Sequence, residues 1–151
     1  MRRQTLRVVL SVLLVLLTVC FIFSNSLKNG IESESQSGRL VALFQSLLRL
    51  EGKVEEEIFH FYVRKTAHFL EFALLGVGLC LMMLSIRGRF GFQSPAAMLF
   101  CLLATAVADE FLQSFTGRTS SVGDVILDFC GGLTGFAVLW ALSVVIRKHK
   151  Q

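Results

Sequence analysis

The sequence predicts an all-α membrane protein with four transmembrane helices, and three observations support this prediction. Hydrophobic residues make up 54% of the 151 residues, which is too apolar for an ordinary soluble domain of this size. Basic residues gather beside apolar runs rather than within them. Four such runs are long enough, or nearly long enough, to cross about 30 Å of hydrocarbon. They span residues 8–23, 67–86, 95–115 and 122–146 of a single membrane domain, 1–151.

A soluble bundle of four buried helices is the alternative fold for these runs. It would leave the all-round apolar faces of the second and fourth runs in water, so we reject it.

The first run, residues 8–23, follows Arg2, Arg3 and Arg7, an arrangement that is also typical of a signal peptide. The small residues that follow the run form only a weak cleavage site. The sequence before Cys20 is similar to a lipoprotein processing site, but Val19 is bulky where a small residue is required. We therefore expect an uncleaved first helix.

The distribution of basic residues predicts the topology, because basic residues in short loops tend to remain cytoplasmic. One cluster precedes the first run, a second occupies the link between the second and third, and a third follows the fourth. An even number of spans with both chain ends in the cytoplasm (N-in, C-in) satisfies all three. This also explains the net charge of +4 without a nucleic-acid partner. The second and third clusters are Arg87 and Arg89, then Arg147, Lys148 and Lys150.

In this topology residues 24–66 form a long extracytoplasmic segment. Leucines and other apolar residues repeat with helical spacing over residues 38–50, which are too few to span a bilayer. We expect an amphipathic helix lying in the outer interface, or one capping the bundle from outside. The acidic residues 55–57 suit the start of the next helix.

The four cysteines lie one in each apolar run, with no CxxC pair and no metal-ligand spacing. We expect small buried hydrophobic residues rather than disulfides or a zinc site, and we assign no metal ligands. They are Cys20, Cys80, Cys101 and Cys130.

Asp109 and Glu110 lie side by side inside the third run. A charged side chain at bilayer depth costs at least about 2.5–3.5 kcal/mol on insertion scales and normally faces a bundle interior or a wet cavity. In the predicted topology the second, third and fourth helices all place polar groups in the outer third of the membrane. These groups are His68 and Glu71, then Asp109, Glu110 and Gln113, then Asp124 and Asp128.

Two further patterns concern the surroundings of these groups. Asp128, Gly131 and Gly135 share one side of the fourth helix, and glycines at this spacing favour close helix approach.

Arg64 and Lys65 lie at the outer end of a span, against the positive-inside bias. They either snorkel to lipid headgroups or pair with carboxylates or an outer anionic group such as a lipid phosphate.

These residues carry the pattern of a known family. The sequence resembles two motifs of the VanZ-like membrane proteins over nearly the whole chain, and the polar Ser24-Asn25-Ser26 is similar to the family's segment after the first span. Asp128 stands where an Asn is expected. The motifs read Arg64-Lys65-x-x-His68-Phe69-x-Glu71-Phe72 and Asp109-Glu110-x-x-Gln113-x-Phe115-x-x-Arg118, the latter followed by Asp124-Val125 and the glycines. The resemblance implies a small multi-pass protein of the bacterial plasma membrane. The namesake member raises resistance to teicoplanin, and no known reaction is implied.

Our first functional hypothesis is a protein that binds or acts on an anionic amphiphile at the outer leaflet, such as an envelope lipid or a lipoglycopeptide. His68 could move protons near neutrality, with Glu71 orienting it. Asp109, Glu110 and Asp124 could supply a general base or a hard-cation site, for which Mg²⁺, Ca²⁺ or Mn²⁺ suits better than Zn²⁺. The expected ligand-binding residues are Arg64, Lys65, Gln113, Arg118 and Asp128.

A structural or regulatory protein is the second hypothesis. In that case the same charges form a network that fixes the bundle, and the outer segment binds a partner. Transport is a weaker third, because the inner halves of the spans are nearly pure hydrocarbon. No hydrolase elbow, zinc helix or phosphate-binding loop is present, so the sequence leaves open whether the protein is an enzyme.

Overall fold

The computed structural model describes residues 2–27, 56–91, 93–116 and 121–149, with side-chain detail for the second range from Phe61 onward. All regular structure in this described part is helical. Each helix is long and apolar enough to cross a membrane, so the predicted fold class is confirmed. The helices are α1 (Arg2–Ser26), α3 (Glu56–Phe90), α4 (Pro95–Ser114) and α5 (Val122–Lys148).

The helices extend past the apolar runs from which they were predicted. Ser26 ends α1, and α3 already begins at Glu56, so parts of the expected outer segment continue the two helices. Hydropathy detects the stretch that suits hydrocarbon, whereas backbone hydrogen bonding can continue the same helix beyond it. The amphipathic helix predicted at 38–50 lies outside the described residues.

Local sequence explains where the helices start and stop. Ser94 and Ser121 are the N-caps of α4 and α5, and their hydroxyl oxygens accept hydrogen bonds from the backbone N–H groups of Ala97 and Asp124. Pro95 follows the first of these caps, where its missing N–H is harmless. Gly91 ends α3 with φ of +73°, a conformation that glycine adopts without a steric penalty.

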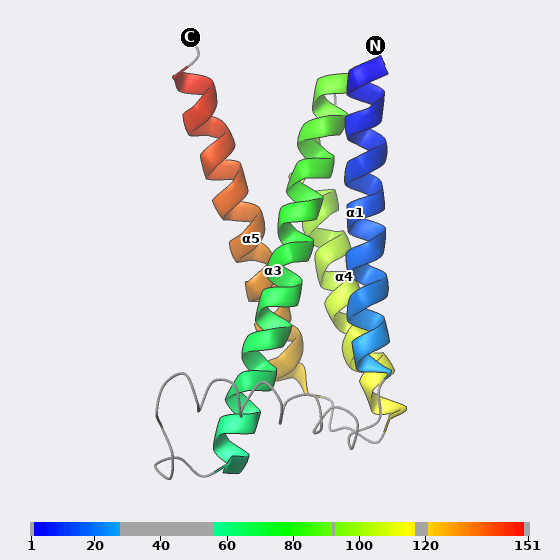
Figure 1. Cartoon of the computed structure of the whole chain (residues 1–151), viewed down its shortest axis with the longest axis vertical. Coiled ribbons are helices and arrows are strands. Elements are labelled where there is room, and N and C mark those ends of the chain that lie inside the picture. The colour runs from blue at the N-terminus through cyan, green and yellow to red at the C-terminus, as the bar shows by residue number, and fades with distance from the viewer. Residues whose placement is uncertain (1, 28–55, 92, 117–120, 150–151) are drawn as a thin grey trace.

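Helix α3 is the centre of the bundle and packs mainly against α5 and α1 (Figure 1). Its buried residues recur every three or four positions and form one face. They meet Ile22 from α1, Leu102 and Ala106 from α4, and Phe136 from α5. The α3 members of this core are Phe72, Leu75, Leu79, Cys80 and Met83.

Glycines bring the backbones of α3 and α5 into close contact, as the spacing in α5 predicted. A Cβ added at Gly135 would lie 2.0 Å from the Ala73 carbonyl oxygen, and one at Gly131 would lie 2.4 Å from that of Phe69. From the other side, a Cβ at Gly76 would lie 1.9 Å from the Gly132 carbonyl oxygen. This proximity brings Asp128, one turn before Gly131, into the interior, where it is 1% exposed.

The cysteine prediction is only partly correct. All four thiols are free, and Cys80 is buried in the core, but Cys20, Cys101 and Cys130 are exposed on the outside of the bundle. Each of these helices buries one face against its neighbours, and its other apolar face suits lipid.

Candidate functional site

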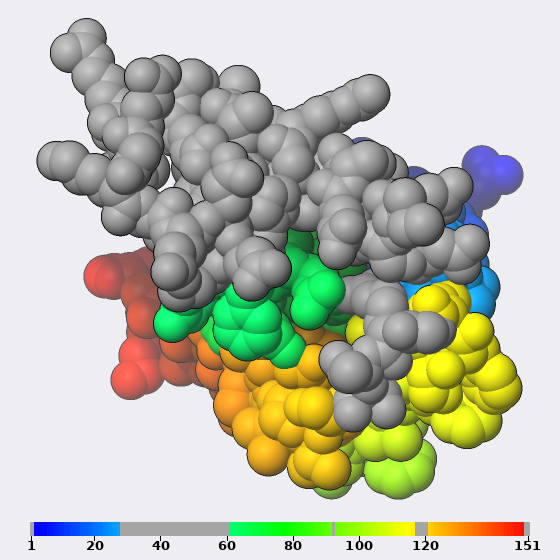
Figure 2. All heavy atoms as spheres, turned by 90° about the horizontal axis from the view of Figure 1, so that it is seen from below, coloured from blue at the N-terminus to red at the C-terminus, as the bar shows by residue number. Residues whose placement is uncertain are grey.

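The start of α1 and the end of α5 lie at one end of the bundle (Figure 1). The buried acids Asp109, Glu110 and Asp128 lie toward the other, which we call the polar end. Here α1 and α4 finish, and α3 and α5 begin. Viewed onto this end, described atoms of all four helices lie next to one another (Figure 2). The predicted convergence of polar groups from three helices is therefore present, and α1 joins it as a fourth.

Asp109 lies at the polar end and is fully buried. Its Oδ1 accepts a hydrogen bond of 2.5 Å from the Ser26 hydroxyl of α1, and its Oδ2 accepts one of 2.8 Å from Gln113 Nε2. The His68 Nδ1 of α3 lies 3.8 Å from Oδ2. Asp109 thus connects three helices.

The neighbouring Glu110 faces a different helix. Its Oε2 accepts a hydrogen bond of 2.9 Å from the backbone N–H of Ser121, the N-cap residue of α5. Adjacent residues of a helix point about 100° apart, so the paired acids of the sequence serve two separate contacts.

Glu71 and Asp124 also make interhelical contacts. The Glu71 Oε1 accepts a hydrogen bond of 2.9 Å from Asn25 Nδ2 of α1. Lys65 Nζ is ion-paired with the carboxylate of Asp124, connecting α3 to α5. Both members of this ion pair are partly exposed, so its contribution to stability is small, about 0–1 kcal/mol.

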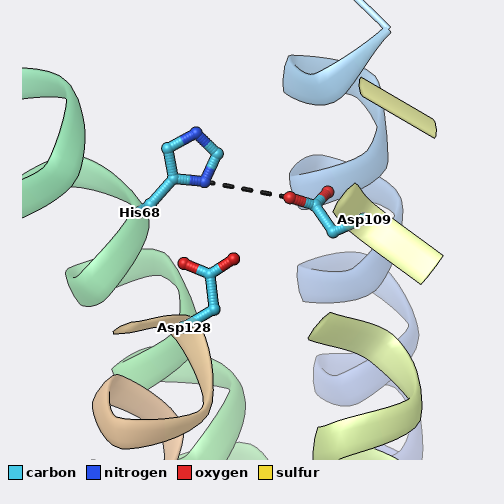
Figure 3. A group of neighbouring side chains, drawn as sticks. All are labelled: His68, Asp109 and Asp128. Carbon is cyan, nitrogen blue, oxygen red and sulfur yellow. Dashed lines mark ion pairs between the residues drawn. The ribbon is translucent and has the colours of Figure 1, made fainter. Parts of the chain in front are cut away.

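His68, Asp109 and Asp128 come from three helices and face a common centre (Figure 3). Each offers one potential ligand atom, and these atoms all lie within 4.8 Å of one another. The sequence did not indicate this set, because its members are far apart in the chain and carry no metal-ligand spacing.

A pocket of about 680 Å³ lies between residues 61–69 of α3 and the start of α5. Arg64 and Lys65 line it together with aromatic rings, and Lys65 Nζ lies 5.2 Å from the ring centroid of Phe61. Arg64 makes no ion pair with any residue that the structure describes. The remaining lining residues are Tyr62, Thr66, Phe69, Ser121, Gly123, Asp124 and Leu127.

Nine of the ten predicted site residues therefore lie at the polar end, and Arg118 lies outside the described residues. Sequence reasoning missed Asn25 and Ser26 as partners of the acids. Being uncharged, they gave no signal of intramembrane charge. The polar Ser24-Asn25-Ser26 segment after the first span was the signal that could have identified them.

Four apolar helices with buried polar groups at one end define a multi-pass helical membrane protein. Comparison with family models matches residues 9–145 to the VanZ/LLP1 family. The chain belongs to this family, which confirms the resemblance found in its motifs. No curated protein and no solved structure matches it.

Proposed function

We propose that this VanZ-family protein binds an anionic amphiphile in the pocket between α3 and α5, at the outer leaflet of the bacterial plasma membrane. The observation that supports the proposal is the combination of cations and aromatic rings in one pocket. Arg64, which makes no ion pair with a described residue, can hold a phosphate or carboxylate in a bidentate manner. Phe61, Tyr62 and Phe69 offer apolar surface to the hydrocarbon part of the same ligand. The pocket volume of about 680 Å³ lies in the usual range for ligand sites.

Lipid binding gives the direct test of this proposal. We expect Arg64→Gln to weaken binding of phosphatidylglycerol to the full chain in detergent about tenfold, because one charge-assisted hydrogen-bonding group is lost. Native mass spectrometry of a phosphatidylglycerol titration measures it, with phosphatidylcholine of equal chain length as the comparison lipid. Arg87→Gln, an exposed arginine at the other end of α3, is the matched control and retains wild-type binding. Equal affinities of the two variants for phosphatidylglycerol would contradict the proposal.

The outer location of the pocket depends on the N-in, C-in topology, which cysteine labelling tests. In a chain whose four cysteines are replaced by alanine, we expect an impermeant thiol reagent to label Ser121→Cys in intact cells. Gly88→Cys, near the opposite end of the bundle, should react only after the membrane is permeabilised. Both positions are exposed in the structure. The reverse pattern would place the pocket on the cytoplasmic side and exclude an outer-leaflet ligand.

An effect on susceptibility to glycopeptide or lipoglycopeptide antibiotics is part of the same proposal, as the family resemblance implies. The wild-type protein and Arg64→Gln are each expressed in a deletion strain. If Arg64→Gln fails to restore the susceptibility that the wild-type protein restores, the effect depends on the pocket. Altered envelope lipids in the deletion strain would favour an enzyme, whereas unchanged lipids with altered drug binding would favour a binding role.

A structural or regulatory role is the second candidate, and the interhelical hydrogen bonds favour it. Asn25–Glu71 and Ser26–Asp109 fix α1 to its neighbours, which is a sufficient reason for the chain to retain those acids. Arg64 has no such structural partner among the described residues. If Arg64→Gln leaves lipid binding and susceptibility unchanged while variants of the network lower stability, the structural role is the correct one.

A further inference from the structure

Asp128 is the buried acid whose surroundings are least satisfied. It is 1% exposed, and neither of its carboxylate oxygens has a hydrogen-bond partner among the described residues. Buried polar groups are nearly always paired, and an unpaired buried carboxylate is strongly unfavourable. The side chain points into the space shared with His68 and Asp109 (Figure 3).

The charges around Asp128 make an unpaired carboxylate at this position still less favourable. Asp109, Glu110 and Asp124 act on it as like charges, and the opposing cation is Lys65. Lys65 is already ion-paired with Asp124. Among the described residues, the interior of the polar end thus has an excess of negative charge, and a cation located between His68, Asp109 and Asp128 would reduce it.

We propose that His68, Asp109 and Asp128 bind a divalent transition-metal ion. Two carboxylates balance the charge of one divalent ion and suit Mn²⁺ as well as Zn²⁺. The imidazole favours Zn²⁺ over Mg²⁺ or Ca²⁺, which prefer oxygen ligands throughout. Ligand bonds of about 2.0–2.2 Å hold ligand atoms about 3–3.5 Å apart. The observed spacing of within 4.8 Å needs only a small closure of side chains to reach this geometry.

The neighbours of the three ligands suit a metal centre. Ser26 and Gln113 hold the Asp109 carboxylate by hydrogen bonds, which is how outer partners orient metal ligands. The His68 side chain is 15% exposed, which offers an entry path for the ion. Three protein ligands leave at least one coordination position for water or another molecule.

Metal titration of the full chain in detergent, after treatment with a chelator, tests the proposal. We expect one Zn²⁺ or Mn²⁺ per chain. His68→Gln and Asp128→Asn should each weaken binding more than about 100-fold, because loss of an outer partner alone costs about 10–100-fold. Pulsed electron paramagnetic resonance of bound Mn²⁺ should show coupling to an imidazole ¹⁴N nucleus that disappears in His68→Gln.

His149→Gln serves as the matched control, because it changes a histidine just after the far end of α5. This variant should bind the ion within about threefold of wild type. The proposal is overturned if the wild-type chain binds no stoichiometric ion at millimolar concentration, if Asp128→Asn binds like wild type, or if the ¹⁴N coupling persists in His68→Gln.

The wild-type chain alone keeps the proposal testable if a variant fails to fold. Zn²⁺ should raise its melting temperature where the same concentration of Mg²⁺ does not, because a ligand that binds the folded state stabilises it. No difference between the two ions would overturn the proposal. These measurements contain no added lipid, so their outcome is independent of the Arg64 test.

Discussion

Gly135→Ala is expected to destabilise the helical bundle by about 3 kcal/mol, the upper part of the usual range for overpacking. The added Cβ would lie 2.0 Å from the carbonyl oxygen of Ala73 and 3.0 Å from its Cα. Both are backbone atoms, so no side chain can rotate to make room. The α3 and α5 helices would have to separate, and Asp128 and Phe136 would lose their packing. Thermal or denaturant unfolding of the purified chain in detergent measures the effect.

Gly88→Ala is the matched control for this substitution. Gly88 lies in α3, and a Cβ there would have no atom within 4 Å. Replacing a helical glycine by alanine in open space stabilises a helix by about 0.5–1 kcal/mol. The two variants therefore differ in sign. If Gly135→Ala unfolded at the same temperature as Gly88→Ala, the α3–α5 backbone contact would be wrong.

The helices and the location of the polar end were predictable from sequence for a physical reason. Bilayer thickness sets the length of an apolar span, and the high energy of intramembrane charge makes Asp109 and Glu110 stand out. Because consecutive spans reverse direction, acids near the end of α4 and the beginning of α5 must meet at the same end. The glycine spacing of α5 also predicted which face lies against a neighbour.

The pairing of individual groups was not predictable, because it depends on how each helix is rotated about its axis. The sequence did not indicate that Asn25 would donate to Glu71 or that Asp109 would lie beside His68. The residues of α5 are apolar on nearly all sides of the helix, so the periodicity of the sequence did not show that Asp128 would be buried. A set of metal ligands contributed by three helices is visible only after the helices are packed.

Ser26→Ala should lower the free energy of unfolding by about 2–3 kcal/mol. The Ser26 hydroxyl is fully buried and donates a 2.5 Å hydrogen bond to the Asp109 carboxylate, and hydrogen bonds to charged groups contribute about 1.5–3 kcal/mol. Its loss leaves one Asp109 oxygen without this donor and loosens the end of α1 from α4. Unfolding of chelator-treated protein in detergent measures the change without a metal contribution.

Ser24→Ala provides the matched control, two residues earlier in α1. Its hydroxyl is exposed and donates to the Cys20 carbonyl oxygen of the same helix, so the substitution should change stability by less than about 0.5 kcal/mol. A double-mutant cycle of Ser26→Ala with Asp109→Asn separates their interaction from general packing and should give a coupling energy above about 1 kcal/mol. If Ser26→Ala matched Ser24→Ala, or if the cycle showed no coupling, the Ser26–Asp109 contact would not hold α1 to the bundle. The acids at the polar end would then be retained for the ligand or the metal rather than for the fold.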